Sequence, residues 1–153
     1  TRGYTPDLID AVIATGGVDV IDILERAEVL HAFRAQPNFD RVYPALNRVL
    51  RILPDLLPTE IQPDLLQDEA ERQLWEAVAK AEATFNQCIQ ERNYTGLLAQ
   101  LAELQPAIDR FFDAVLVMAE EPEIRFNRLA LLNEIAKNVY VVADLRKLVI
   151  AGD

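Results

Sequence analysis

The chain has 153 residues, of which 51% are hydrophobic, and this is enough to bury one sizeable core. Its formal net charge of -10 argues against non-specific nucleic-acid binding, because such binding needs basic side chains to neutralise phosphates. No apolar run approaches the roughly 18 residues that a membrane span needs, so we expect no membrane partner.

The apolar residues recur at helical spacing, and the chain has only 5 Gly, which points away from a β-sandwich or a Gly-rich α/β fold. A short first helix is expected over about 6–14, with Pro6 near its first turn and a Gly-Gly pair ending it. Asp19 is placed to cap a second helix that runs to about Ala35.

Asn38 opens a third predicted helix, whose apolar positions continue to Leu53. Pro44 lies inside this pattern, and proline removes one helical hydrogen bond. We therefore expect a kink or a restart at 43–44. The segment 54–66, PDLLPTEIQPDLL, has little periodicity and predicts an ordered connector whose leucines dock on the core.

In the second half of the chain, Asp68 and Glu71 have the spacing of a capping box, and an apolar helical stripe follows them. Asn93 interrupts that helix, and another runs through YTGLLAQLAELQ. Pro106 marks a kink or a new start of a helix that continues through PAIDRFFDAVLVM.

The last and longest predicted helix runs from about Pro122 to Ile150, because its apolar stripe keeps helical spacing throughout. No repeat, low-complexity tract or internal boundary divides 1–153, so we expect a single domain. The predicted fold is an all-α bundle of about six or seven helices joined by short loops.

The residue inventory restricts catalytic chemistry. The chain contains no serine, one Cys and one His, so a Ser-based triad is impossible and a Cys–His pair requires Cys88 with His31. Nothing in the local sequence favours that pair, and Cys88 is expected to be a small core residue. A lone cysteine also excludes an internal disulfide and is compatible with a reducing, cytoplasmic setting. No catalytic residue is predicted.

The sequence contains one pattern that is typical of a metal site. Glu28 and His31 have the Glu-x-x-His spacing of di-iron bundles, but a second such motif is needed and the chain has a single His. We expect a partly buried, hydrogen-bonded His31 near a helix end. Asp109 and Asp113 are four residues apart and are expected to form a solvated edge beside Arg110 rather than an acid–base pair.

The charge is unevenly placed along the chain. The stretch 55–91 is strongly acidic, with nine carboxylates against Arg72 and Lys80, whereas 38–53 and 122–150 carry most of the clustered basic residues. This distribution predicts a basic face on an acidic body.

The stretch 106–150 resembles the C-terminal signature of the glycine–tRNA ligase beta subunit. Its pieces occur in order: Phe111-Phe112-Asp113, the segment Val115 to Met118, the acidic turn Glu120-Glu121, the run Arg125 to Leu132, and Ala143-Asp144. Upstream, ALNRVLRIL at 45–53 resembles a basic helix of the family, with Asn47 where lysine is usual and Arg51 where asparagine is usual. Pro63 to Leu74 resembles the acidic stretch that follows, so the resemblance covers about 30–153.

The resemblance implies a DALR-like anticodon-binding domain, a C-terminal fragment of a longer chain, as the opening TRGYTPDLID without an initiator Met or signal peptide also indicates. It implies binding of tRNA(Gly), with no DNA or membrane partner, and pairing of the full subunit with a catalytic alpha subunit in a heterotetramer. ATP, magnesium and glycine would bind elsewhere in that assembly, so no cofactor is expected in this fragment.

An anticodon loop is recognised by cations that bind its phosphates and by flat or amide groups that meet its bases. We expect the start of the last helix to do this, where Arg125 and Arg128 share a surface and Asn127 can reach base edges. The alternative is that these arginines pair with neighbouring glutamates.

A second candidate for RNA contact is the set Arg41, Arg48 and Arg51, provided that Pro44 leaves the helix straight. Phe111 and Phe112 are expected to pack in the core rather than to stack on bases. A different class of function remains open, namely a helical protein-interaction scaffold that uses the acidic stretch 55–91 to meet a basic partner.

Overall fold

The computed structural model describes residues 3–17, 19–55 and 60–150. Within these residues the chain is helical and contains no strand, so the predicted all-α bundle is confirmed. The elements in chain order are α1 (Pro6–Ile13), α2 (Val20–Arg34), α3 (Phe39–Ile52), the 3₁₀ turn η1 (Pro63–Leu65), α4 (Glu69–Gln90), α5 (Tyr94–Glu103), α6 (Gln105–Ala114), α7 (Pro122–Val142) and the 3₁₀ turn η2 (Leu145–Lys147).

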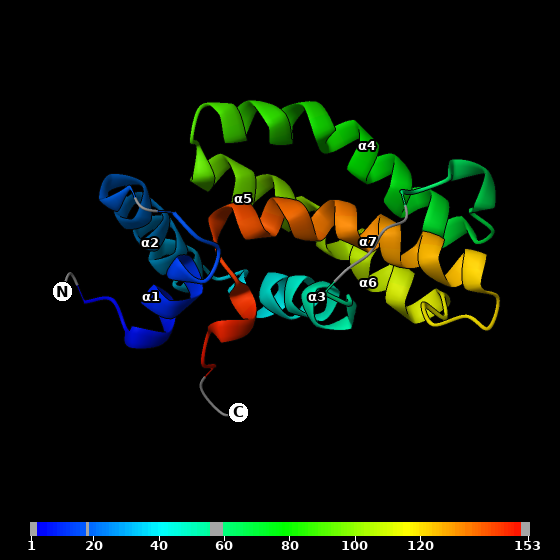
Figure 1. The fold of residues 1–153 in the computed structure, drawn as a ribbon, viewed down its shortest axis with the longest axis horizontal. Helices are drawn as coiled ribbons and strands as arrows, with labels where there is room; N and C mark the ends of the chain where they lie inside the picture. Colours follow the sequence, from blue (N-terminus) through cyan, green and yellow to red (C-terminus); the bar gives the residue numbers. More distant parts are fainter. Residues whose placement is uncertain (1–2, 18, 56–59, 151–153) are drawn as a thin grey trace.

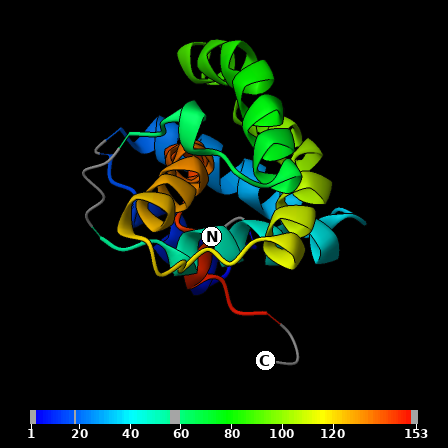
Figure 2. The same ribbon diagram turned by 90° about the vertical axis from the view of Figure 1, so that its right-hand side faces the viewer.

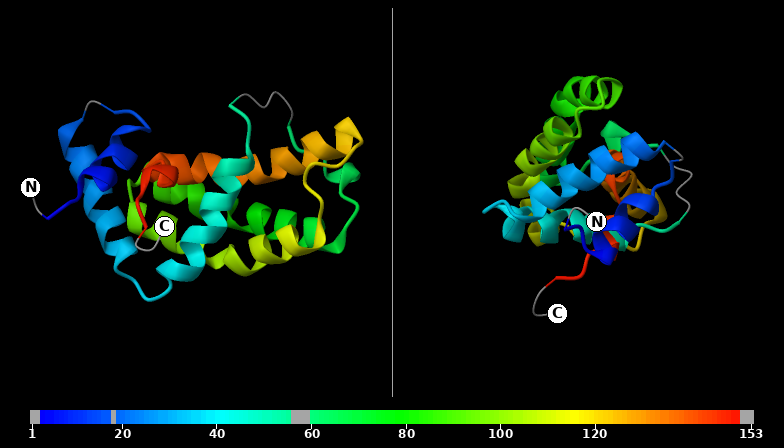
Figure 3. Two further views of the ribbon diagram at one scale, coloured as in Figure 1. Left: turned by 90° about the horizontal axis from the view of Figure 1, so that it is seen from below. Right: turned by 90° about the vertical axis from the view of Figure 1, so that its left-hand side faces the viewer.

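The helix α7 lies at the centre of the bundle and packs against α3, α4 and α5 (Figure 1). The pair α1 and α2 lies at one end, and η2 packs between α1 and α3. Turning the molecule shows that α4 and α3 lie on opposite sides of α7 (Figure 2). Seen from below, α3 crosses in front of the other long helices (Figure 3).

The central position of α7 explains its sequence. It is buried around most of its circumference, including Leu131, Leu132 and Val139, which are fully enclosed. In a helix that is covered on several sides, apolar residues are not confined to one face. In α3, by contrast, one face is buried and the other is exposed. The large aromatic side chains Phe85 and Phe111 fill the core beside it, as expected of Phe111.

The predicted helix starts at Asp19, Asp68 and Asn93 are confirmed. The Asp19 carboxylate accepts from the backbone N–H of Ile21. Asp68 forms a complete capping box, because its side chain caps the backbone while the Glu71 carboxylate accepts from its N–H at 3.0 Å. The Asn93 side chain caps α5. These caps satisfy backbone donors that helix ends leave without partners.

The predicted break at 43–44 is wrong, because α3 runs without interruption through Pro44. Pro44 is exposed, so the Asp40 carbonyl, which loses its usual donor, is on the solvent side. On the opposite face Leu46 and Val49 are completely buried, and this packing holds the helix together.

The last helix is shorter than predicted, because α7 ends at Val142 and Ala143 is fully extended. The backbone N–H of Asp144 then donates to the carbonyl of Ala11 in α1 at 2.8 Å. Leu145 is completely buried between α1 and α3. The apolar spacing after Val142 therefore predicted correctly which residues are buried. The backbone there is an extended residue followed by a 3₁₀ turn, and not a continuation of the helix.

The end of α6 and the connector before α4 differ in how far they follow the predictions. The helix expected through Met118 ends at Ala114, and Val115 is extended. In the connector, Leu66 docks on the core as predicted, whereas Leu56 and Leu57 lie outside the described residues.

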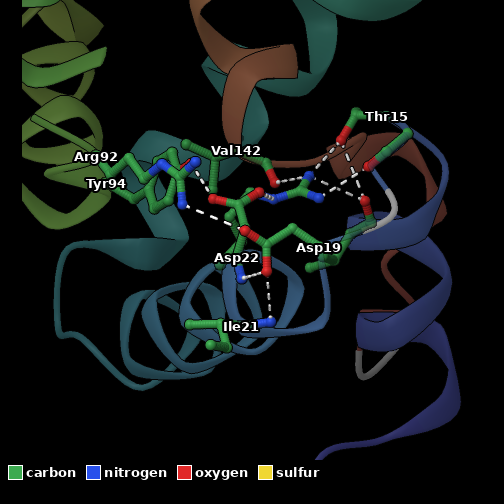
Figure 4. A network of polar contacts seen from close by, with 10 residues as sticks. Thr15, Asp19, Ile21, Asp22, Arg92, Tyr94 and Val142 are labelled. Carbon is green, nitrogen blue, oxygen red and sulfur yellow. Dashed lines mark hydrogen bonds and ion pairs between the residues drawn. The ribbon is translucent and has the colours of Figure 1, made fainter. Parts of the chain in front are cut away.

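The end formed by α1 and α2 is joined to α7 by Arg26, a charged side chain that is only 3% exposed. Its guanidinium donates to the Asp22 carboxylate at 3.0 Å, to Thr15 Oγ1 at 2.7 Å, and to the carbonyls of Val12 and Val142 at 3.1 and 3.2 Å. Figure 4 shows Thr15, Asp22 and Val142 converging from different elements. Arg26 therefore satisfies carbonyls at the ends of both α1 and α7.

The same network reaches α5. The Tyr94 hydroxyl donates to the Asp22 carboxylate, and the Arg92 guanidinium lies 3.5 Å from Asp19 (Figure 4). Burial, followed by this hydrogen bond to Asp22, raises the pKa of Tyr94 to about 12.

The helices α4 and α5 approach closely near Cys88, which is buried as predicted for a core residue. A Cβ atom at Gly96 would lie 2.5 Å from Asn93 Nδ2 and 3.1 Å from Cys88 Sγ, so a larger residue there would displace the Asn93 side chain that caps α5. By contrast, His31 is exposed, with its ring 5.4 Å from that of Tyr4, so the expectation that it is partly buried is wrong.

Among the described residues, no helix has both the length and the apolar character that crossing a bilayer requires.

Candidate nucleic-acid interface

The unbroken helix α3 gathers three arginines on one exposed face. Arg41, Arg48 and Arg51 are separated by seven and three residues, with Pro44 between them, and this spacing corresponds to one side of a straight α-helix. All three side chains are exposed. We call these three residues the α3 arginine stripe.

The stripe is held by contacts that leave its charge uncompensated. The Arg48 guanidinium lies over the Phe112 ring of α6, 4.1 Å from the centroid, and Arg51 Nη2 donates to the carbonyl of Arg146 at 3.2 Å. In the described parts of the chain, none of the three arginines forms an ion pair. An exposed, unpaired guanidinium stacked on an aromatic ring is well suited to bind phosphate, because its planar N–H edge stays free.

The turn η2 adds basic residues next to Arg51. Arg146 pairs with the Asp144 carboxylate at 2.9 Å, and Lys147 beside it is exposed. Burial of Asp144 opposes ionisation, but hydrogen bonds from the side chain and backbone of Arg146 outweigh it, and the pKa of Asp144 is lowered. Asp144 compensates Arg146, whereas Lys147 forms no ion pair with the described residues and is an additional cation at this edge. Sequence reasoning missed it because it assigned 145–150 to the last helix.

Arg125, at the start of α7, is half-buried. Its Nη1 donates to the carbonyl of Ala119 at 3.2 Å, and its guanidinium lies 5.1 Å from the centroid of the Phe126 ring. The alternative pairing with nearby glutamates is not found in the described part of the chain. The charge of Arg125 is thus not compensated by an ion pair in the described residues, but its side chain is held against the loop that precedes α7.

Arg128 and Asn127 have placements that argue against direct RNA contact. Arg128 is 8% exposed, and it forms an ion pair with Glu71 at 3.0 Å and donates to the carbonyl of Leu116 at 2.6 Å. Asn127 is 1% exposed, and its Oδ1 accepts from the backbone N–H of Gln62 at 2.7 Å. The physical reason is that the connector before α4 and the first turn of α4 cover this end of α7.

The remaining candidates have the surroundings that the sequence predicts. Phe112 is 9% exposed and packs edge-on against Phe111, so it belongs to the core while one face supports Arg48. Asp109 and Asp113 are exposed on α6, as expected of a solvated edge. Within the described residues, no group of three His, Cys, Asp or Glu side chains is arranged to hold a metal ion.

The sequence is similar to proteins of known family. Residues 45–144 match the DALR anticodon binding domain family. Two relatives are the glycine–tRNA ligase beta subunits of Acidobacterium capsulatum, 36% identical over 96% of this chain and 22% of the relative, and of Trichlorobacter lovleyi, 37% identical over 96% and 21%. That of Anaeromyxobacter sp. (strain K) is 38% identical over 97% and 22%.

The chain thus spans about a fifth of the length of the curated relatives that it matches. The family match extends from within α3 to Asp144, so it includes two arginines of the stripe, and it occurs on an all-helical fold. The chain belongs to the DALR anticodon-binding domain family.

Proposed function

We propose that this chain binds the anticodon loop of a tRNA through the α3 arginine stripe, with Lys147 at its edge. The observation that carries the proposal is a row of exposed guanidinium groups without carboxylate partners among the described residues. In a protein of net charge -10, such a row is the place where a polyanion can approach.

The chemistry of the stripe suits an RNA loop. Arginine binds phosphate oxygens in a bidentate manner and also stacks on flat rings, and single-stranded RNA offers both phosphates and unstacked bases. Arg48 is already stacked on Phe112, so its orientation is fixed before RNA arrives. A fixed guanidinium loses less side-chain entropy on binding.

The relatives point to the tRNA and to the assembly. These relatives are glycine–tRNA ligase beta subunits, so the tRNA in this proposal is tRNA(Gly). The chain would support the ATP-dependent attachment of glycine in the cytoplasm as part of a longer subunit that pairs with an alpha subunit. ATP, magnesium and glycine would be bound elsewhere in that assembly.

The test is filter binding of the chain to tRNA(Gly) and to the same tRNA with a changed anticodon. We expect Arg48→Ala combined with Arg51→Ala to weaken binding by about tenfold, or ~1.4 kcal/mol. The salt dependence, as the slope of log K against log salt, should fall by about 1.5, because each lost phosphate contact contributes ~0.7–0.9.

The matched control is Arg72→Ala combined with Lys80→Ala, which removes the same charge from exposed positions on α4. Equal weakening by the two pairs would mean that net charge alone matters and would remove the stripe as the site. Equal affinity for both tRNAs would contradict anticodon recognition.

A further inference from the structure

A cleft of about 270 Å³ lies between α4 and α7. Its apolar part is formed by Ile61, Val78 and Phe85, and the half-buried indole of Trp75 lines it as well. Because α4 and α3 are on opposite sides of α7, this cleft belongs to a different side of the molecule from the arginine stripe (Figures 1 and 2).

The polar lining of the cleft presents hydrogen-bond acceptors. Asn138 is 7% exposed, and its Nδ2 donates to the carbonyl of Glu134 at 2.8 Å, which fixes the orientation of the amide. Among the described residues, no donor reaches the Asn138 Oδ1. Glu82 is exposed and, in the same described residues, has no cationic partner. The other two charges cancel, since Lys137 pairs with Glu134 at 2.7 Å.

We propose that this cleft binds an arginine side chain of a partner protein. An occupant must bring donors to the Glu82 carboxylate and the Asn138 Oδ1, lie against the Trp75 ring, and cover an apolar surface. A guanidinium has five N–H donors and no acceptor, it stacks on aromatic faces, and its stem is apolar. Arginine satisfies each of these requirements with a single side chain.

The charge around the cleft favours a protein over an RNA. The exposed carboxylates of α4 are Glu69, Glu76 and Glu82, with the exposed Glu91 directly after the helix, and the exposed cations of this helix are Arg72 and Lys80. A nucleobase that entered the cleft would bring phosphates toward this acidic helix, whereas a basic protein segment is attracted to it. The proposal is independent of the tRNA site, since the two share no residue.

The chain has a single tryptophan, so the fluorescence of Trp75 reports directly on the cleft. The probe is the capped tripeptide acetyl-Leu-Arg-Leu-amide, titrated to millimolar concentration against the same peptide with citrulline, the neutral isostere of arginine. We expect a saturable change with the arginine peptide and an affinity at least tenfold lower for the citrulline peptide.

Glu82→Gln should weaken the arginine peptide at least fivefold, whereas Glu76→Gln, an equal charge change on the same helix but outside the cleft, should leave it unchanged. Far-UV circular dichroism of both variants checks that α4 stays folded. The proposal is overturned by the absence of a saturable change, by equal affinity for the citrulline peptide, or by equal effects of the two variants. A saturable change with an RNA trinucleotide that Glu82→Gln does not alter would also overturn it and would assign the cleft to RNA.

Discussion

The helices α3 and α7 are neighbours that both carry clustered arginines, and the two clusters have opposite surroundings. Arg48 and Arg51 are exposed and have no carboxylate partner in the described chain. Arg128 is buried, and its guanidinium is paired with the carboxylate of Glu71, a residue of α4 that is 0% exposed. The same residue type thus serves a surface on one helix and the interior on the other.

A cationic side chain is therefore available to a ligand only where no other element of the protein covers it. The connector and the start of α4 cover the first turns of α7, where Gln62 binds Asn127 and Glu71 binds Arg128. Nothing in the described chain covers the outer face of α3. The Asn127 and Arg128 side chains, in the second turn of α7, are therefore engaged by other parts of the protein.

The largest effect is expected for Arg128→Ala, which should lower the free energy of unfolding by about 3–5 kcal/mol. Removing the guanidinium leaves the Glu71 carboxylate buried without its counter-ion. Urea unfolding followed by circular dichroism measures the loss. A variant of unchanged stability with reduced tRNA affinity would instead return Arg128 to the RNA site. Glu71→Met combined with Arg128→Met should recover part of the stability, because no charge is then left buried, although the Asp68 N–H loses its Glu71 acceptor.

The second effect tests whether burial decides if an arginine stabilises the fold. Arg26→Met should cost about 3 kcal/mol, because it leaves the carbonyls of Val12 and Val142 without this donor. The control is Arg41→Met on the exposed face of α3, which should change stability by less than about 0.5 kcal/mol. Similar losses in the two variants, measured by thermal unfolding, would contradict the distinction.

A smaller effect of opposite sign is expected on α3. Pro44→Ala restores a helical donor for the Asp40 carbonyl on the solvent side and should raise the free energy of unfolding by about 1–2 kcal/mol. The tRNA affinity should stay the same, since the helix is already continuous through this residue. A destabilised variant would show that the packing of α3 requires the proline.

The smallest effect concerns pH, and it probes the turn that holds Arg146 beside Arg51. The pKa of Asp144 is lowered in the folded chain, so the ionised carboxylate stabilises the fold above the ordinary pKa of 3.8. This stabilisation is lost as the pH falls through the lowered value. Asp144→Asn should therefore reduce the pH dependence of stability below about pH 4 by about 1.5 kcal/mol at most, the low end for a hydrogen bond to a charged group, because Arg146 is partly exposed. Unfolding curves that keep their wild-type pH dependence would contradict this.

Local signals predicted most of the fold. The capping groups of Asp19, Asp68 and Asn93 act within a few residues, and the apolar stripes mark the buried faces, so helix starts and core positions followed from the sequence. The end of α7 did not, because Asp144 is held by Ala11, a residue far away in the chain. The burial of Arg128 could not be predicted either, because its ion pair with Glu71 joins two helices that are far apart in the sequence.

The close approach of α4 and α5 allows the opening rate of this helix pair to be measured through Cys88. Cys88 is the chain's only thiol and is 7% exposed, and its Sγ would lie 3.1 Å from a Cβ atom added at Gly96. A disulfide reagent can therefore reach the sulfur only when this helical hairpin opens. The rate of labelling in plain buffer then measures how often the hairpin separates while the protein is still native, at a time scale that denaturant titrations do not sample.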